Sequence, residues 1–174
     1  MALPITPRTV AVELDASKDY FEKNKRCLMC DCIAQELDSG KRIVREDDHF
    51  VVIAPYASRF PFECWVIPRV HRCTFETVTD EDVRHLAVTM RDVLGRLKAG
   101  LKDPPYNFYL HTSPNIKAQP TPFASWPTLE HDYHWHFEIM PRLTTIAGFE
   151  WGTGVYINSM PPEEAARFLR EVEA

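Results

Sequence analysis

The sequence predicts an α+β fold in which helices pack on an antiparallel sheet. Short apolar runs typical of strands follow one another across polar turns. One long segment carries apolar residues at helical spacing, as an amphipathic helix does. The resulting order of hairpin, strand, helix, strand, strand, helix favours this class of fold.

The composition is that of a globular protein. The chain has 174 residues, enough for one domain with a core, and 45% of them are hydrophobic and 26% charged. The formal net charge of −5 argues against nucleic-acid binding. No apolar run approaches the roughly 18–20 residues that span a bilayer, and the first residues lack the apolar core of a signal peptide. We therefore expect no membrane partner and a cytoplasmic location.

The chain has five cysteines, an odd number. This favours cysteines that act as metal ligands or free thiols over a disulfide framework. Cys27 and Cys30 form a C-x2-C pair, and this spacing lets two thiolates hold one tetrahedral ion from a tight turn. A redox pair or two buried thiols would have the same spacing.

Near the N-terminus the sequence has prolines and no clear period. We expect residues 1–16 to form a loosely attached arm and residues 17–174 to form a single domain. Ser17 is the expected start of a short helix through Lys25, and residues 33–37 are expected to form a helical turn.

The first strands follow. Residues 42–46 and 50–54 are joined by a polar turn and predict a hairpin. Residues 62–68 predict a third strand that Pro68 ends. His71 lies three residues further on, and composition alone indicates a surface loop histidine.

The main helix is expected at residues 77–101, with Thr79 or Asp80 as its cap. Its apolar side chains form one stripe that we assign to the core: Val83, Leu86, Ala87, Met90, Val93, Leu94 and Leu97. A fourth strand is expected at residues 107–111.

The last third of the chain combines loops and glycines. Residues 113–130 predict a long loop, a length that is often functional or mobile. The glycines of residues 148–154 let the backbone approach a ligand or another chain. A last strand is expected at residues 155–158, and a closing helix from residue 161 or 162 to residue 173.

The most informative stretch is residues 131–142. Ligand-type side chains occupy the alternate positions His134, His136 and Glu138. Apolar side chains fill the positions between: Trp135, Phe137 and Ile139. In a strand this alternation sends the polar set to one face and the apolar set to a core, whereas a helix would scatter the trio by about 200° per step of two. The stretch therefore predicts a strand with a functional face. The alternative is a half-buried strand whose polar face happens to hold histidines.

Two chemical centres are possible. Cys27 and Cys30 need two more ligands for a closed zinc site, and His71 and His134 are the plausible pair because Cys2His2 is a standard zinc set. Spacing alone does not bring these four residues together, and free thiols remain the alternative.

His136 is the second centre. A neutral imidazole can attack an electrophilic phosphorus and carry the transferred group covalently. Glu138 repels a phosphoryl group unless it is protonated, hydrogen-bonded away or bound to a metal. With His111, these two residues would instead form a two-histidine, one-carboxylate metal site. The two interpretations compete for His136.

The stretch from His134 to Arg142 resembles the histidine-triad signature H-x-H-x-H followed by Pro-Arg, with Glu138 in place of the third histidine. The C-x2-C pair and the sequence Pro-Arg-Val-His at residues 68–71 are similar to the zinc-binding members of that superfamily. Four further segments jointly resemble the C-terminal half of the galactose-1-phosphate uridylyltransferase branch: residues 54–63, 103–114, 148–154 and 156–158.

This resemblance implies a histidine-triad-like fold and a set of site residues. It implies zinc at Cys27, Cys30, His71 and His134. It places His136 at the nucleophile position of a histidine-triad protein. It also places His111, His136 and Glu138 at a second metal position, for iron or zinc. It implies substrate contacts at Asn107, Phe149, Trp151 and Thr153, although the acidic residue of the family there is replaced by Gly154. The catalytic His-Pro-His of the family lies in the other half and does not occur here.

The leading hypothesis is a nucleotidyltransferase. It would move a nucleotidyl group between a nucleoside diphosphate sugar and a hexose 1-phosphate through a covalent nucleotidyl-histidine at His136, as a homodimer that reproduces the two-half enzyme. One alternative is a catalytically silent metal-binding domain derived from the non-catalytic half. Another is a histidine-triad nucleotide hydrolase, which needs a third histidine where this chain has Glu138.

Overall fold

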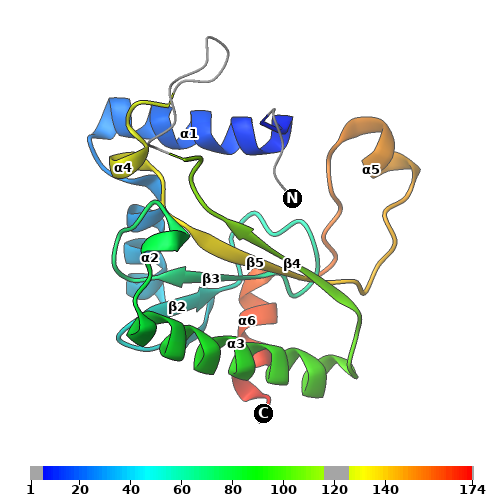
Figure 1. Cartoon of the computed structure of the whole chain (residues 1–174). Coiled ribbons are helices and arrows are strands. Elements are labelled where there is room, and N and C mark those ends of the chain that lie inside the picture. Colours follow the sequence, from blue (N-terminus) through cyan, green and yellow to red (C-terminus); the bar gives the residue numbers. More distant parts are fainter. Residues whose placement is uncertain (1–5, 116–125, 174) are drawn as a thin grey trace.

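The computed structural model describes residues 6–115 and 126–173. Within these ranges, five strands form one antiparallel sheet in the order β1-β2-β3-β5-β4 (Figure 1). The strands are β1 (Ile43–Glu46), β2 (Phe50–Ile53), β3 (Cys64–Pro68), β4 (Tyr106–His111) and β5 (His136–Pro141). The predicted α+β fold class is confirmed.

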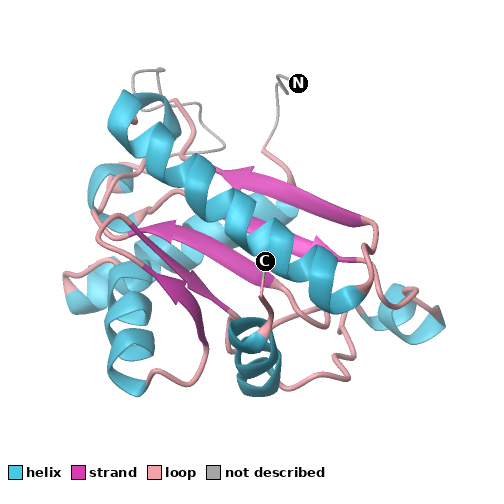
Figure 2. Cartoon of the chain, turned by 90° about the horizontal axis from the view of Figure 1, so that it is seen from below, coloured by secondary structure: helices cyan, strands magenta, loops and turns pink. Residues whose placement is uncertain are grey.

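Helices pack on both faces of this sheet. The helices of the described ranges are α1 (Arg8–Asn24), α2 (Leu28–Ser39), α3 (Asp80–Leu101), α4 (Leu129–Asp132), α5 (Gly148–Thr153) and α6 (Pro162–Glu171). Figure 2 shows the long α3 lying across the strands. Val93 of α3 and Leu169 of α6 pack with Val52 in the main core, whereas Ile33 of α2 packs with Val51 in a second cluster. Because successive side chains of a strand point to opposite faces, the two clusters lie on opposite sides of the sheet.

Strand β5 has the predicted alternation. Trp135, just before the strand, and Ile139 are buried in the main core. His136 and Glu138 lie on the other face, where Glu138 pairs with Trp65 of β3 and with Tyr109 of β4. The strand begins at His136 rather than earlier in the expected stretch of residues 131–142, because residues 131 and 132 belong to α4.

The cap predicted for the main helix is confirmed. Thr79 Oγ1 accepts a hydrogen bond from the backbone N–H of Asp82 at 3.1 Å, and Asp82 Oδ2 accepts one from the backbone N–H of Thr79 at 2.9 Å. This reciprocal capping box satisfies two backbone donors that the first turn would otherwise leave unpaired. The helix starts three residues later than expected, because a 3₁₀ turn occupies Phe75–Thr77.

The N-terminal arm expected over residues 1–16 is wrong for residues 8–16, which belong to α1. Leu14 is 1% exposed and packs with Leu129 and Tyr133. The apolar contacts that hold Leu14 come from residues distant in the sequence, Cys73, Leu129 and Tyr133, so no local period predicts them. Residues 1–5 lie outside the described ranges.

Three other expectations change. The expected turn at residues 33–37 is part of the longer α2, and the glycine-containing segment forms α5. Residues 155–158 are not a strand, and the side chains of Val155 and Ile157 are exposed instead of pairing with the sheet. Of the predicted loop at residues 113–130, residues 116–125 lie outside the described ranges.

Among the described helices, none combines the length and the apolarity that crossing a bilayer requires. The cytoplasmic location stays a prediction.

Candidate functional site

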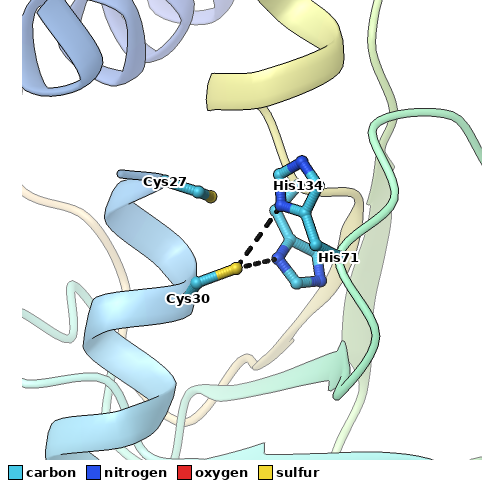
Figure 3. A group of neighbouring side chains, drawn as sticks. All are labelled: Cys27, Cys30, His71 and His134. Atoms are coloured by element: carbon cyan, nitrogen blue, oxygen red, sulfur yellow. Dashed lines mark hydrogen bonds between the residues drawn. The ribbon is translucent and has the colours of Figure 1, made fainter. Parts of the chain in front are cut away.

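Four side chains from three separate segments converge beside the N-terminus of α2 (Figure 3). Cys27 is the residue just before α2 and Cys30 lies in its first turn, so the C-x2-C spacing places both sulfurs on one side of the helix start. His71 follows β3, and His134 precedes β5. The candidate ligand atoms of the four residues all lie within 4.8 Å of one another. The fold thus supplies the proximity that spacing alone did not.

The two imidazoles of this cluster are oriented by backbone carbonyls. His71 Nε2 lies 3.1 Å from the carbonyl oxygen of Glu130, and His134 Nε2 lies 2.9 Å from that of Pro68. A carbonyl oxygen only accepts hydrogen bonds, so each Nε2 carries the proton and each Nδ1 keeps its lone pair. These Nδ1 atoms face Cys30 Sγ at 3.4 and 3.6 Å. Such outer hydrogen bonds are the usual way in which metal-binding histidines are held.

The thiols are tuned by their neighbours. The Cys30 thiol lowers the pKa of Cys27 by hydrogen bonding, against the effect of burial, and the two imidazoles act in the same direction. Two sulfurs and two imidazole nitrogens form the donor set that zinc takes in closed tetrahedral sites. The residues present therefore fit a structural zinc ion, which would fix the start of α2 to the segment before β5.

A second group of polar and titratable side chains surrounds His136, which is 1% exposed. Its Nδ1 lies 3.0 Å from the carbonyl oxygen of His134, so Nδ1 donates and Nε2 keeps a lone pair. The ring lies between Trp65 and His111, with centroids at 5.2 and 4.8 Å. The imidazole is thus held in one orientation and one tautomer.

Glu13 is a member of this group that the sequence did not point to. Its carboxylate lies 2.7 Å from His111 Nδ1 and accepts a hydrogen bond from the Tyr133 hydroxyl at 2.8 Å. Burial alone would raise the pKa of Glu13, but the hydrogen bond and charge of His111 outweigh it and lower the pKa. Ligand atoms of Glu13, His111 and His136 lie within 4.8 Å of one another. Glu13 carries no motif and falls in the expected arm, so only the docking of α1 reveals it.

Glu138 has a different partner from the one expected. Its carboxylate is paired with the Arg59 guanidinium, and its oxygens lie 3.7 Å from His111 Nε2 and 3.9 Å from His136 Nε2. Burial alone would raise the pKa of Glu138, but the neighbouring imidazole of His136 and the charge of Arg59 lower it. The converging metal-type group therefore contains Glu13 in the place where Glu138 was expected.

The residues expected to contact substrate lie apart from His136. Phe149, Trp151 and Thr153 are on α5, which follows the far end of β5 and projects from the sheet (Figure 1). Asn107 pairs with Met140, also near that end. His136 begins the strand, and a six-residue strand is about 17 Å long. One chain therefore does not bring the expected substrate residues to His136.

Comparisons with known proteins all point to one family. A family model described as galactose-1-phosphate uridyl transferase, C-terminal domain, matches residues 13–173. ADP-glucose phosphorylase of Arabidopsis thaliana is 39% identical over 173 residues, which cover 99% of this chain and 45% of that protein. Galactose-1-phosphate uridylyltransferase of Thermotoga maritima is 28% identical, over 99% of this chain and 53% of that protein. The chain spans about half the length of these curated relatives.

Solved structures agree. The crystal structure of an ADP-glucose phosphorylase from Arabidopsis thaliana with bound ADP-glucose has a TM-score of 0.86 and 38% identity, covering 100% of this chain and 52% of that chain. A zinc-bound histidine triad family protein from Mycobacterium smegmatis has a TM-score of 0.52 at 19% identity, covering 83% of this chain and 90% of that chain. The second likeness is one of fold alone.

Proposed function

Because the chain belongs to the galactose-1-phosphate uridyl transferase C-terminal domain family, we propose that it takes part in nucleotidyl transfer between a nucleoside diphosphate sugar and a hexose 1-phosphate. Two relatives support the substrate class. One is a phosphorylase solved with bound ADP-glucose, and the other is a galactose-1-phosphate uridylyltransferase. Zinc is the proposed ion of the Cys27, Cys30, His71 and His134 cluster, on the ground of its donor set.

His136 is the proposed carrier of the nucleotidyl group, and its ring geometry is the observation that supports this role. Its Nδ1–H is held by the carbonyl of His134, which leaves the Nε2 lone pair as the nucleophile. In the first step Nε2 forms a bond to the α-phosphorus and the bond from that phosphorus to the bridging oxygen breaks, releasing sugar 1-phosphate. In the second step a phosphate oxygen of the incoming hexose 1-phosphate displaces the histidine.

The charges around His136 set a condition for this step. The carboxylates of Glu13 and Glu138 both repel an approaching phosphate. His111 partly neutralises Glu13, and Arg59 partly neutralises Glu138. The side chain of Arg59 is 40% exposed, so this cation, which lies beside the group, can also face an incoming phosphate.

We predict that incubation with UDP-glucose or ADP-glucose adds one UMP or AMP group to His136, because Nε2 is the free nucleophile. Mass spectrometry of peptides prepared at alkaline pH, where phosphoramidates survive, detects the addition. His136→Asn should abolish it, and His131→Asn, on the outside of α4, should not. The absence of an adduct with both nucleotide sugars, or an adduct that persists in His136→Asn, would contradict this role.

A second candidate function is favoured by the Glu13 group and by the burial of His136. In this alternative the chain is a catalytically silent, metal-stabilised half, and His136 is a ligand together with Glu13 and His111. Two nitrogens and one carboxylate suit iron or zinc. A buried ring with two carboxylates near it favours a cation over a phosphate.

Metal content separates the two candidates. The silent-half alternative predicts two tightly held metal ions per chain after dialysis against a chelating resin, measured by elemental analysis. Glu13→Gln should lower the number to one because it removes an anionic ligand. Glu22→Gln, on the same helix and 56% exposed at its side chain, is the matched control. One ion or none in the parent protein, or an unchanged count in Glu13→Gln, would exclude this alternative.

We also propose that the chain pairs with a second copy of itself. Strand β4 is the last in the sheet order, and Phe108 and Tyr109 on it are half exposed. Trp151 on α5 is 77% exposed. An open sheet edge with large apolar side chains favours association. A second copy would supply the half that the longer relatives contain.

Sedimentation equilibrium tests this pairing. The parent protein should sediment as a dimer at micromolar concentration. Phe108→Lys should raise the dissociation constant about tenfold or more, because a charge at the centre of an interface loses its water. Val83 was expected in the core stripe of α3 but is 47% exposed, and Val83→Lys should leave the dissociation constant unchanged. A monomeric parent, or equal effects of the two variants, would refute the homodimer.

A further inference from the structure

A third group of metal-type side chains lies at the start of the main helix α3. His49 is in the turn between β1 and β2, and Glu81 and His85 are in the first turns of α3. Glu81 and His85 are four positions apart, so they share one face of the helix. Candidate ligand atoms of all three residues lie within 4.8 Å of one another.

The turn that carries His49 is fixed against α3. Asp47 Oδ1 accepts hydrogen bonds from the backbone N–H groups of His49 and Phe50, at 2.9 and 2.8 Å. Thr89 of α3 donates to the other Asp47 oxygen at 3.3 Å. The carbonyl of His49 accepts from the backbone N–H of Arg69 at 2.8 Å. The three ligand-type groups therefore meet on a rigid backbone, and only their side chains need to adjust.

The chemical groups of this cluster are not used elsewhere. Among the described residues, none forms a hydrogen bond with a ring nitrogen of His49 or His85, and Glu81 has no cationic partner within 4.0 Å. The two imidazole rings instead stack, with centroids 3.5 Å apart and 12° between the planes. The imidazoles of His49 and His85 and the carboxylate of Glu81 therefore have lone pairs available for a ligand.

Carboxylates lie around this cluster, and two cations near the same turn are already paired, Arg45 with Asp47 and Arg69 with Glu46. Asp80 and Asp82 flank Glu81 in the first turn, and Asp48 precedes His49 in the turn. Asp82 is paired with Arg72, whereas Asp48 and Asp80 are exposed. Two neutral imidazoles and one carboxylate are the three-ligand set on which zinc keeps a fourth position for water.

We propose that His49, Glu81 and His85 form a divalent transition-metal site, for zinc or an ion of similar preference, that ties the β1–β2 turn to the start of α3. Imidazole nitrogens bind metals in the plane of the ring. One ring of the stacked pair must therefore leave the stack and turn about χ2 to direct its lone pair at the shared ion, and both histidines are partly exposed. The site shares no residue with the cysteine cluster or with the group around His136.

The test is zinc binding to the metal-replete protein. The protein is first dialysed against metal-free buffer so that tightly held ions stay in place, and then titrated with zinc chloride by equilibrium dialysis. The parent should bind one more exchangeable zinc per chain than His85→Gln or His49→Gln. Glu81→Gln should weaken binding of this ion by about tenfold or more. Added zinc should also raise the melting temperature of the parent, because an ion that binds only the folded chain stabilises it, and should do so less in these variants.

Two controls make the result specific. His131→Gln removes another histidine outside the cluster and should bind as many exchangeable ions as the parent. His111→Gln removes a ligand near His136 and should not alter the ion lost in His85→Gln. Equal stoichiometry and affinity in the parent, His49→Gln and His85→Gln, with all three folded by circular dichroism, would overturn the proposal.

Discussion

His134 is the residue on which both candidate centres depend. Its Nδ1 faces Cys30 in the cysteine cluster, and its Nε2 donates to the carbonyl of Pro68. Its own carbonyl accepts the Nδ1–H of His136 and so fixes the tautomer of that ring. The side chain of one buried residue thus belongs to the cysteine cluster, while its backbone orients the imidazole proposed for chemistry. A structural zinc contributes about 10–16 kcal/mol in small peptides, as much as the net stability of a whole domain, which is about 5–15 kcal/mol. We therefore expect that loss of the proposed zinc would loosen His134, and His136 with it.

The alternation in the histidine-rich stretch could be predicted because a strand enforces it. When every second side chain is apolar, the pattern indicates a strand with one buried face. Trp135 and Ile139 are buried, as this pattern predicts. The C-x2-C spacing was equally local, since Cys27 and Cys30 lie in one turn of helix. The partnership with His71 and His134 was proposed from the Cys2His2 donor set and from family resemblance, and the fold brings the four residues together.

What the sequence did not reveal depends on contacts between distant residues. Glu13 is an ordinary helical glutamate until α1 docks through Leu14 onto Tyr133 and places it beside His111. Glu138 lies on the same face of β5 as His136, as the alternation predicts, but its ion-pair partner Arg59 comes from a loop 79 positions away. Neither partner is visible in a local pattern. A carboxylate within a titratable cluster takes whichever cation the tertiary fold brings closest, and that choice decides whether it repels phosphate or holds a metal.

The two ends of β5 have different chemistry, and this asymmetry explains why the chain is expected to need a second half. The ordered imidazoles lie at the start of the strand, and the exposed aromatic residues lie beyond its end. We propose that the cysteine cluster holds zinc and through His134 orders the start of β5. X-ray absorption at the zinc edge on the purified protein tests it most directly. We predict a first shell of two sulfurs at about 2.3 Å and two nitrogens at about 2.0–2.1 Å. A shell without sulfur, or the absence of zinc from a folded protein, would contradict it.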